Sequence, residues 1–450
     1  MLSNSGLDHI WLPFTSWRDS IDYPPLVIRR AAGIHLYDQY DTSYIDATGS
    51  WWVSLFGHNH PHITSAVRQQ LDRLEHVMMA GCIAEPTIRL SGLLSAMLPR
   101  KLDKLFFSDN GSTSVEVAMK IALQYHRQTG NDRRRQFIGL GGGYHGDTLG
   151  AMSVGSIPQY HALFHETFKQ GFFTDPPSCY RCPCGKAPSD CAAQCMNSLE
   201  TLCDAHGDEV AAVIFEPMVQ GAVGMRIYPP VVLKRIFELC ERHHILTIAD
   251  EVAMGFGRTG TLFACNHAGV VPDIMCLAKG LTAGFLPLAI TAVTATIFEA
   301  FKGDAHSGKT FEHGHTFTGN ALACAAGCAT LELMNEMNIP ESLTLLSAQL
   351  TRHLQSFAGY DIVGDIRCLG TVGALELVAD RKTKQRLDPQ RRIPFLICRN
   401  ALKRGVLLRP LGDVIYFMLP YITTPEQLDF IMSVTHEAFT ETLDGIDSAA

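Results

Sequence analysis

Three short apolar runs, each followed directly by a charged side chain, constrain the fold of this chain more than any other feature. They occupy residues 210–215, 245–249 and 274–278 and are followed by Glu216, Asp250 and Lys279. Apolar runs without polar alternation are typical of parallel strands covered on both faces by helices. Because the loops at the carboxyl ends of such strands form the ligand crevice of an α/β sheet, we expect these charged residues, with Gln220, at one rim.

Lys279 is the residue around which the candidate site is organised. Small residues and glycine surround it in the segment 278–284. Such a setting can confine an amine where desolvation or a nearby cation lowers its pKa and frees its lone pair. The alternative is a solvated lysine at a strand end, so the case for chemistry depends on the rest of the chain.

The composition narrows the class of protein. A chain of 450 residues is long enough for two or three domains. Its net charge of −8 argues against nucleic acid as the main partner, because phosphate binding needs a basic surface. No apolar run reaches the ~20 residues that span a bilayer. The first residues lack the charged and apolar regions of a signal peptide, so we expect a cytoplasmic protein without a membrane partner.

A polar turn at residues 108–113 joins a predicted strand (102–107) to a predicted helix that begins at Ser114. A turn rich in glycine and hydroxyl groups at a helix N-terminus offers free N–H groups and the positive end of the helix dipole to an anion. An ordinary N-cap is the alternative. Because the turn also contains Gly111, a phosphate cup stands beside the ordinary N-cap as an interpretation.

The loop at residues 141–147 is glycine-rich and contains Tyr144 and His145. Its glycines fit the spacing of a dinucleotide-binding fingerprint, and Glu166 lies at the distance of a ribose contact. The residues after Gly146 do not form a convincing amphipathic helix, which weakens that interpretation. We favour a loop that presents the Tyr-His pair to a planar ligand.

The chain has 14 cysteines, and several crowd into a turn-rich excursion at residues 176–200. The spacings favour a tetrahedral thiolate site for zinc, or an iron–sulfur cluster, formed by Cys179, Cys182, Cys191 and Cys195. Cys184 is a fifth candidate, and free surface thiols are the alternative. A closed site of four thiolates would be structural and not catalytic.

Two further segments contain candidate ligand-binding side chains. Trp51 and Trp52 lie in a glycine-flanked loop, where they belong either to the core or to the wall of an apolar pocket. The histidine cluster at residues 58–62 has the composition of a metal site, but Pro61 interrupts any regular ligand spacing. Arg409 precedes a proline and a glycine turn and could present a bidentate fork to a substrate carboxylate.

Together these parts match what a pyridoxal phosphate enzyme requires. A lysine forms the Schiff base, a carboxylate keeps the pyridine nitrogen protonated, a cup holds the phosphate, and a tyrosine packs near the ring. The chain also resembles the fold-type I, class III aminotransferases over nearly its whole length. The motifs that carry the resemblance are Trp-Leu-Pro-Phe-Thr-Ser, Gly-Ser-Trp-Trp, Asn-Gly-Ser, Gly-Tyr-His-Gly-Asp-Thr, Ala-Asp-Glu-Val, Ala-Lys-Gly-Leu and Arg-Pro-Leu-Gly.

The resemblance implies an α/β fold with two parts. The large domain has a mainly parallel seven-stranded sheet covered by helices, and a smaller α+β domain accompanies it. The implied division gives residues 1–60 to an N-terminal segment that contributes to the small domain and the active site. Residues 61–335 form the cofactor-binding domain with the cysteine-rich excursion, and residues 336–450 form the small domain. The implied assembly is a homodimer with shared active sites.

The resemblance also implies roles for particular residues. The catalytic group consists of the Schiff-base lysine, the pyridinium partner and the ring-stacking tyrosine, namely Lys279, Asp250 and Tyr144. The phosphate is bound by Gly111 and Ser112, with His315 and Thr316 supplied by the other subunit. The substrate site is shaped by Phe14, Trp51, Gly314 and Arg409, together with Tyr144 and Lys279.

The double tryptophan and the Arg-Pro-Leu-Gly turn are similar to those of class III enzymes that act in biotin biosynthesis. The implied reaction transfers an amino group from S-adenosyl-L-methionine to 8-amino-7-oxononanoate and gives 7,8-diaminononanoate. Phe14 replaces a tyrosine that is typical of adenosylmethionine users, and His315 replaces a usual proline. Both features are similar to relatives that use L-lysine as donor, so either amine remains possible.

Two other functions remain as alternatives. One is another class III ω-aminotransferase that acts on a different diamine or ω-amino acid, against which the Trp51–Trp52 pair speaks. The other comes from a different class of protein. It is a non-enzymatic metal-binding or redox-sensing protein that uses the cysteine-rich excursion.

Overall fold

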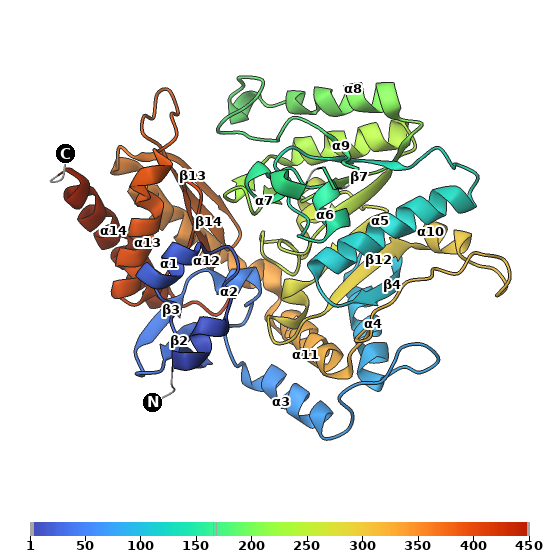
Figure 1. Ribbon diagram of the computed structural model, residues 1–450, viewed down its shortest axis with the longest axis horizontal. Coiled ribbons are helices and arrows are strands. Elements are labelled where there is room, and N and C mark those ends of the chain that lie inside the picture. Colours follow the sequence, from blue (N-terminus) through green and yellow to red (C-terminus); the bar gives the residue numbers. More distant parts are fainter. Residues whose placement is uncertain (1–3, 165, 168, 448–450) are drawn as a thin grey trace.

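The computed structural model describes residues 4–164, 166–167 and 169–447. Seven strands build the main sheet in the order β4–β12–β11–β10–β7–β5–β6. They are β4 (Leu102–Ser108), β5 (Gln136–Gly139), β6 (Phe172–Phe173), β7 (Val210–Phe215), β10 (Leu246–Asp250), β11 (Ile274–Leu277) and β12 (Ala289–Thr294). Within this sheet β12 pairs antiparallel with β4 and β11, and the other pairs are parallel. The predicted mainly parallel seven-stranded sheet is confirmed (Figure 1).

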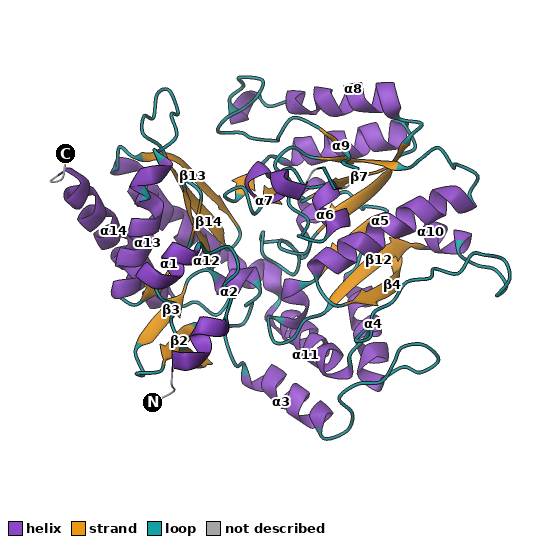
Figure 2. Cartoon of the chain, in the orientation of Figure 1, coloured by secondary structure: helices purple, strands orange, loops and turns teal. Residues whose placement is uncertain are grey.

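Both faces of this sheet are buried, as its unbroken apolar strands predict. In β7, Val213 and Phe215 pack into the cluster that contains the apolar face of α9 (Pro230–Arg242). Ala212 and Ile214 point to the opposite side and pack with α5 (Gly111–Gln128). Alternate side chains of one strand therefore enter two different cores, which removes apolar surface from water on both sides. Figure 2 shows the helices that surround the strands.

The remaining elements of the first 300 residues are mostly helical. The α-helices are α1 (Trp17–Asp22), α2 (Gly49–Trp52), α3 (Pro61–Leu71), α4 (Glu85–Met97), α6 (Leu149–Ser153), α7 (Pro158–His161), α8 (Asn197–His206) and α10 (Ala295–Ala300). The 3-10 helices are η1 (Asn4–His9), η2 (Ala162–Phe164), η3 (Pro188–Asp190), η4 (Gln194–Met196), η5 (Ala264–Ala268) and η6 (Lys279–Thr282). A two-stranded hairpin is formed by β8 (Val219–Gln220) and β9 (Arg226–Ile227).

Segments from the first 60 residues and from the last part of the chain together form the second part of the molecule (Figure 1). One sheet combines β1 (Ile28–Ala32), β2 (His35–Asp38) and β3 (Ser43–Asp46) with β15 (Val406–Leu407), which pairs parallel to β3. An antiparallel sheet contains β13 (Val363–Leu369), β14 (Val372–Leu377), β17 (Val414–Met418) and β16 (Pro410–Leu411). The helices after residue 320 are α11 (Ala321–Met337), α12 (Ile339–Gln355), η7 (Ser356–Gly359), η8 (Pro389–Arg391), α13 (Ile393–Lys403) and α14 (Pro425–Asp447).

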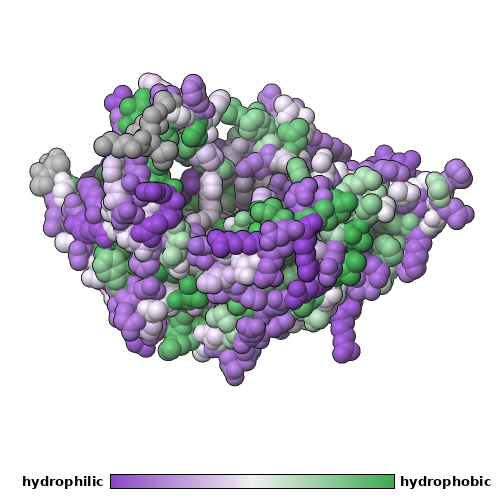
Figure 3. All heavy atoms as spheres, turned by 90° about the horizontal axis from the view of Figure 1, so that it is seen from below, coloured by the Kyte–Doolittle hydropathy of each residue, from purple (hydrophilic) through white to green (hydrophobic). Residues whose placement is uncertain are grey.

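The surface combines polar cover with exposed apolar side chains. Figure 3 shows one face on which hydrophobic side chains form patches between hydrophilic ones. Elsewhere in the chain, Trp11 is 96% exposed, Leu163 is 90% exposed and Phe317 is 59% exposed. Among the described residues, no helix combines the length and the apolar character needed to cross a membrane.

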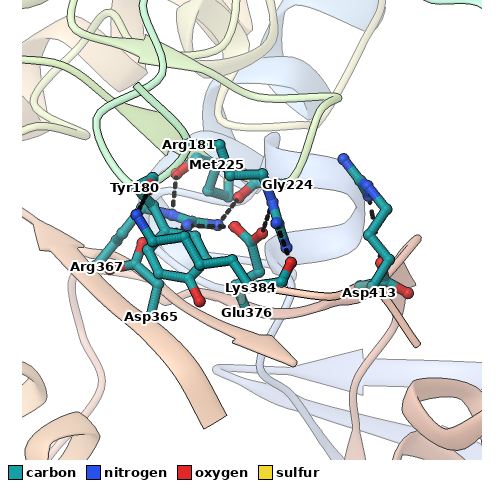
Figure 4. A network of polar contacts seen from close by, with 10 residues as sticks. Tyr180, Arg181, Gly224, Met225, Asp365, Arg367, Glu376, Lys384 and Asp413 are labelled. Carbon is teal, nitrogen blue, oxygen red and sulfur yellow. Dashed lines mark hydrogen bonds and ion pairs between the residues drawn. The ribbon is translucent and has the colours of Figure 1, made fainter. Parts of the chain in front are cut away.

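A polar network joins the cysteine-rich excursion to the antiparallel sheet (Figure 4). Arg181 donates through Nε to Glu376 of β14 at 3.0 Å. Arg367 of β13 donates to the other oxygen of Glu376 at 2.7 Å and to the carbonyl of Gly224 at 2.7 Å. Lys384 donates to the carbonyl of Tyr180 at 2.6 Å. Because all of these groups are paired and most are partly buried, they fasten the excursion across two parts of the fold.

The helical apolar pattern of residues 63–79 predicts one helix over this range, but the observed helix, α3, is shorter. It begins at Pro61 and ends at Leu71, and the chain then turns away. The ring of His76 packs against Phe317, with centroids 5.1 Å apart, and Asn320 donates to the carbonyl of Glu75 at 3.0 Å. These tertiary contacts replace the last turns of the helix, so helical periodicity alone extended it too far.

Candidate active site

A cleft of about 820 Å³ lies at the carboxyl ends of β7, β10 and β11. Of the residues predicted for the site, it is lined by Phe14, Trp51, Gly111, Ser112, Tyr144, Asp250, Lys279 and Arg409. The charged residues that follow the three buried strands, Glu216, Asp250 and Lys279, all line this cleft. The position follows from the topology, because parallel strands bring their carboxyl ends to one edge.

Lys279 lies two residues after the end of β11 and has a left-handed backbone, with φ of +44°. Its ammonium nitrogen lies 4.2 Å from the centroid of the Trp52 ring. Burial lowers the pKa of Lys279 to about 8, and the carboxylates of Asp250 and Glu216 oppose this shift. An amine with a lowered pKa keeps a larger neutral fraction, which a nucleophile needs.

Asp250 ends β10 and is 5% exposed. Its Oδ2 lies 2.8 Å from Nδ1 of His145, and its Oδ1 accepts the N–H of Val252 at 3.1 Å. Because a carboxylate can only accept, Nδ1 of His145 carries the shared hydrogen. The other ring nitrogen of His145 is buried, and no hydrogen-bond partner for it occurs in the described chain. The pair therefore holds a buried acceptor at the base of the cleft.

Glu216 fastens the glycine-rich loop to β7. Its two oxygens accept the backbone N–H of Tyr144 at 3.0 Å and that of Gly221 at 2.8 Å. Burial raises the pKa of Glu216 to about 7, an effect that His145 opposes and that Asp250 increases. The sequence placed this carboxylate at the rim without giving it a role. The structure shows that it sets the position of Tyr144.

The predicted phosphate cup has the geometry of a capped helix N-terminus. Asn110 accepts the N–H of Thr113 at 3.1 Å, and the Thr113 hydroxyl accepts the N–H of Asn110 at 3.0 Å. The N–H groups of Gly111 and Ser112 precede the first intrahelical hydrogen bond and so are available to an anion. Gly146 has φ of +122°, and a Cβ there would collide with the Ser112 hydroxyl. The two glycines keep the cup open.

We call Asp250, Lys279, Glu216, His145 and the cup of Gly111 and Ser112 the floor of the cleft. We call the outer group, which consists of Phe14, Trp51, Tyr160 and Arg409, the mouth.

The mouth is aromatic and more exposed than the floor. Phe14 is 51% exposed and Trp51 is 39% exposed. The ring of Phe14 makes edge contacts with Trp51 and Tyr160, at centroid distances of 5.7 Å and 5.2 Å. The guanidinium carbon of Arg409 lies 4.5 Å from the centroid of the Trp51 ring. A guanidinium stacked in this way is oriented and keeps its N–H edge for another group.

The double tryptophan lies in a left-handed turn that the sequence did not reveal. Gly49, Ser50, Trp51 and Trp52 have φ values of +58°, +45°, +64° and +78°. Each non-glycine residue in this region costs about 1–2 kcal/mol relative to ordinary backbone. Arg258, which is 1% exposed, donates to the carbonyl of Trp52 at 3.1 Å and helps to hold the turn. One glycine before two tryptophans was the only sequence signal.

Tyr160 and Asp147 line the cleft but were not predicted as site residues. The Tyr144 hydroxyl donates to Asp147 at 2.8 Å, and the Tyr144 ring lies 6.2 Å from that of Tyr160. Burial raises the pKa of Tyr144 far above its ordinary value, and the hydrogen bond to Asp147 adds to the shift. Asp147 could have been found from the Gly-Tyr-His-Gly-Asp motif. Tyr160 has no sequence signal beyond its ring.

Three predicted residues do not line this cleft. They are Gly314, which was predicted to shape the substrate site, and His315 and Thr316, which were predicted to come from a second subunit. Gly314 and Thr316 are exposed on the loop before α11, and His315 is partly buried. Nδ1 of His315 lies 2.9 Å from Oδ2 of Asp109, which precedes the cup. The loop therefore lies near the phosphate end of the site without entering it.

The cysteine-rich excursion does not gather a metal site. Among the described residues, no three or more His, Cys, Asp or Glu side chains are arranged to hold a metal ion. The expected ligands Cys179, Cys182, Cys191 and Cys195 are all free thiols. Cys195 is buried in an apolar cluster, against which Cys179 and Cys191 pack. Burial raises the pKa of Cys195 to about 12 and that of Cys179 to about 11, which favours neutral thiols over ligating thiolates.

Comparison with known proteins places the chain in a family. The family model described as aminotransferase class-III matches residues 18–439. An adenosylmethionine-8-amino-7-oxononanoate aminotransferase from Nitratidesulfovibrio vulgaris is 43% identical over 432 residues, which cover 96% of this chain and 80% of that protein.

Solved structures agree with this match. The enzyme of the same name from Methanocaldococcus jannaschii has a TM-score of 0.92 at 35% identity, covering 97% of this chain and 98% of that one. A PLP-bound amine transaminase from an uncultivated Pseudomonas species has a TM-score of 0.92 at 34% identity, covering 96% and 98%. These structures confirm the predicted fold-type I architecture. The chain belongs to the class III aminotransferase family.

Proposed function

We propose that this chain is a pyridoxal phosphate-dependent aminotransferase that converts 8-amino-7-oxononanoate to 7,8-diaminononanoate in biotin biosynthesis. The observation that carries the proposal is the meeting of Lys279, Asp250 and the Gly111–Ser112 cup in one cleft. The relatives from Nitratidesulfovibrio vulgaris and Methanocaldococcus jannaschii are named as aminotransferases of 8-amino-7-oxononanoate, and they match nearly the whole of this chain.

The donor set of the cleft fits pyridoxal phosphate. A Cβ at Gly111 would approach a methyl carbon of Val252 to 2.7 Å, so the cup admits no side chain at that position. The helix N-terminus suits a phosphate dianion, the buried Asp250 carboxylate suits a protonated pyridine nitrogen, and Lys279 supplies the amine. When bound, the cofactor supplies an electron sink that lets an amino group pass between two carbon skeletons.

Three side chains of the cleft, those of Lys279, Asp250 and Tyr144, would have separate roles in the reaction. Lys279 holds and moves the proton at the substrate carbon, which a lowered pKa favours near neutral pH. Asp250, oriented by His145, would keep the ring nitrogen protonated. Tyr144, whose backbone is fixed by Glu216, would pack against the ring. Two hydrogen-bonded pairs, Asp250 with His145 and Glu216 with Tyr144, would hold these groups in place.

The mouth would select the keto acid. Arg409, stacked on Trp51, would hold the carboxylate of 8-amino-7-oxononanoate through its N–H fork. The aliphatic chain of the substrate would lie against Trp51 and Phe14, whose exposed rings provide apolar surface.

We propose S-adenosyl-L-methionine as the amino donor, supported by the names of the relatives. L-Lysine is the second candidate, because Phe14 offers no hydroxyl at the donor side of the mouth. The two are separated by mixing cofactor-loaded protein with each amine alone and following the visible absorbance of the bound cofactor. Loss of that absorbance with one amine, and its return on adding 8-amino-7-oxononanoate, would identify the donor and the acceptor.

Failure with both amines would exclude the proposed reaction. Activity with a different diamine or ω-amino acid would then favour another class III aminotransferase. Protein that binds no pyridoxal phosphate but carries metal would favour the non-enzymatic alternative at the cysteine-rich excursion.

We further propose that the protein is a cytoplasmic homodimer. Each chain would be divided into an N-terminal segment (1–60), a cofactor-binding domain (61–335) and a small domain (336–450). His315 lies against Asp109 beside the cup, and Thr316 and Phe317 on the same loop are exposed, which supports a loop that completes a partner's site. The test mixes two inactive variants, Lys279→Ala and Thr316→Arg, which carry their defects in different subunits of a shared site. Recovery of activity on mixing supports shared sites, whereas a monomeric protein in sedimentation would exclude them.

A further inference from the structure

The left-handed turn of Gly49–Trp52 needs a counterforce, because three of its four residues have a Cβ in a backbone region that disfavours side chains. The turn also positions two functional neighbours. Trp51 supports the guanidinium of Arg409 at 4.5 Å, and Trp52 lies 4.2 Å from the amine of Lys279. A relaxed turn would therefore move both the mouth and part of the floor.

Asp46 is the group best placed to hold this turn. It is 0% exposed and ends β3, directly before the turn. Oδ1 accepts the backbone N–H of Thr48 at 3.1 Å and its hydroxyl at 2.9 Å. Oδ2 accepts the hydroxyl of Ser50 at 2.7 Å and lies 3.0 Å from Nε2 of His58. Four polar contacts converge on one buried carboxylate, which is expensive to bury unless it is fully paired.

The backbone around Asp46 ties the turn to Arg409. Asp46 pairs with Leu407 in the parallel ladder of β3 and β15, and Arg409 follows two residues later. His58 is fixed as well, because its backbone pairs with Gly33 through hydrogen bonds of 2.6 Å and 3.1 Å. The histidine cluster at residues 58–62 has the composition of a metal site, but one of its rings, that of His58, lies against the Asp46 carboxylate.

We propose that Asp46 is a positioning residue that holds the Gly49–Trp52 turn through Ser50 and His58, so that Trp51 supports Arg409 at the keto-acid site. The role in substrate binding rests on the proposed function, whereas the hold on the turn does not. Asp46 itself does not line the cleft, and it acts through the tryptophans.

The test separates the hydrogen bonds from the backbone strain that they offset. Asp46→Asn keeps the shape of the side chain but replaces the oxygen that faces Ser50 and His58 with an amide donor. Ser50→Ala removes the hydroxyl and keeps the strain, whereas Ser50→Gly removes the hydroxyl and relieves the strain. The matched control is Asp38→Asn. Asp38 is a buried carboxylate in the same sheet and accepts the N–H of Tyr40 at 2.8 Å, but it does not line the cleft.

Steady-state kinetics with the keto acid provide the first measurement. We expect Asp46→Asn and Ser50→Ala to raise KM by about tenfold with less than about threefold change in kcat, as for a lost charge-assisted hydrogen bond. Ser50→Gly, alone or combined with Asp46→Asn, should keep KM within about threefold of the unmodified protein, because glycine adopts the left-handed region freely. Asp38→Asn should lower thermal stability without changing KM.

The second measurement is near-ultraviolet circular dichroism of the cofactor-free protein, because this spectrum reports the environment of the tryptophans without turnover. The spectrum should change in Asp46→Asn and return toward the original in the double variant with Ser50→Gly. An unchanged spectrum in Asp46→Asn, or equal KM values for Ser50→Ala and Ser50→Gly, would overturn the proposal. If the protein does not use the keto acid, the spectra still decide whether Asp46 holds the turn.

Discussion

The charged side chains of the floor lie at or near strand ends, whereas the mouth consists of three aromatic rings and an arginine on loops and short helices outside the main sheet. At the floor, Asp250 and Glu216 are each 5% exposed and each makes contacts shorter than 3.2 Å. At the mouth, Phe14 and Trp51 are 51% and 39% exposed and are held mainly by ring contacts. Buried hydrogen bonds fix position in a way that exposed apolar contacts do not.

This difference assigns chemistry to the floor and selectivity to the mouth. Groups that stabilise developing charge must be preorganised, which the floor achieves by burial and pairing. Groups that choose between amines and keto acids can differ without disturbing the fold, which suits loops on a rigid scaffold. Floor variants should therefore lower kcat for every substrate, and mouth variants should change KM for particular ones.

The largest effect is expected at Lys279. Lys279→Ala removes the amine, and we expect turnover to fall by about a thousandfold or more, since general acid–base catalysis alone contributes ~10²–10⁴-fold. The visible absorbance of the lysine-bound cofactor should vanish while the thermal unfolding midpoint stays nearly constant. Lys302→Ala, at an exposed position, is the control. A fully active Lys279→Ala variant would overturn the mechanism.

A somewhat smaller loss is expected at Asp250. Asp250→Asn removes the charge that keeps the ring nitrogen protonated, and we expect kcat to fall by about a hundredfold to a thousandfold, as for one preorganised electrostatic group. The control is Asp273→Asn at the other end of the same strand pair, where Asp273 accepts the Thr247 N–H at 2.8 Å. Equal kcat losses in both variants would show that stability, and not ring protonation, is responsible.

The floor could be predicted from the sequence for a physical reason. A parallel strand fixes where its last residue lies, so Asp250 and Lys279 could be placed together before any contact was known. The cup of Gly111 and Ser112 was similarly readable, because a strand, a turn and a helix in sequence fix the N-terminus of that helix.

The mouth could be predicted only in part. Motif resemblance identified Phe14, Trp51 and Arg409 but gave none of their contacts. The left-handed turn and the position of Tyr160 depend on tertiary contacts, such as the hold of Arg258 on the Trp52 carbonyl, that no local pattern encodes. The cysteine spacing was misleading for the same reason, since Cys195 packs into an apolar cluster.

The pH dependence of cofactor capture should sharpen the description of the floor. The pKa of Lys279 is lowered to about 8, and only the neutral amine attacks. Capture of pyridoxal phosphate by the cofactor-free protein should accelerate by about fiftyfold between pH 6 and pH 8 and then level off, as the neutral fraction does for that pKa. Stopped-flow absorbance measures the rate. A rate that still rises steeply between pH 8 and pH 10 would indicate an ordinary, solvated lysine, whose pKa is about 10.4.

Arg409 tests the mouth directly. Arg409→Ala should raise KM for the keto acid by about tenfold to a hundredfold, because hydrogen bonds to a charged group contribute ~1.5–3 kcal/mol. The kcat value should change much less. Arg409→Lys should have a KM between those of the unmodified protein and Arg409→Ala, because lysine keeps the charge but lacks the planar fork. The control is Arg386→Ala, because Arg386 pairs at the surface with Asp413 at 3.2 Å. A large fall in kcat with constant KM would move Arg409 from selection to chemistry.

The smallest effect is expected for donor choice at Phe14. The resemblance places a tyrosine at this position in adenosylmethionine users, so Phe14→Tyr should raise kcat/KM for adenosylmethionine relative to lysine by about threefold to tenfold, the range of one modest hydrogen bond. Tyr160, with its ring 5.2 Å from that of Phe14, already brings a hydroxyl-bearing ring to the same wall. Tyr160→Phe is therefore the matched variant, and it should lower the same ratio if that hydroxyl serves the donor. If neither variant changes the ratio while both change KM for the keto acid, the wall of Phe14 and Tyr160 selects the acceptor, and donor choice must be decided elsewhere in the cleft.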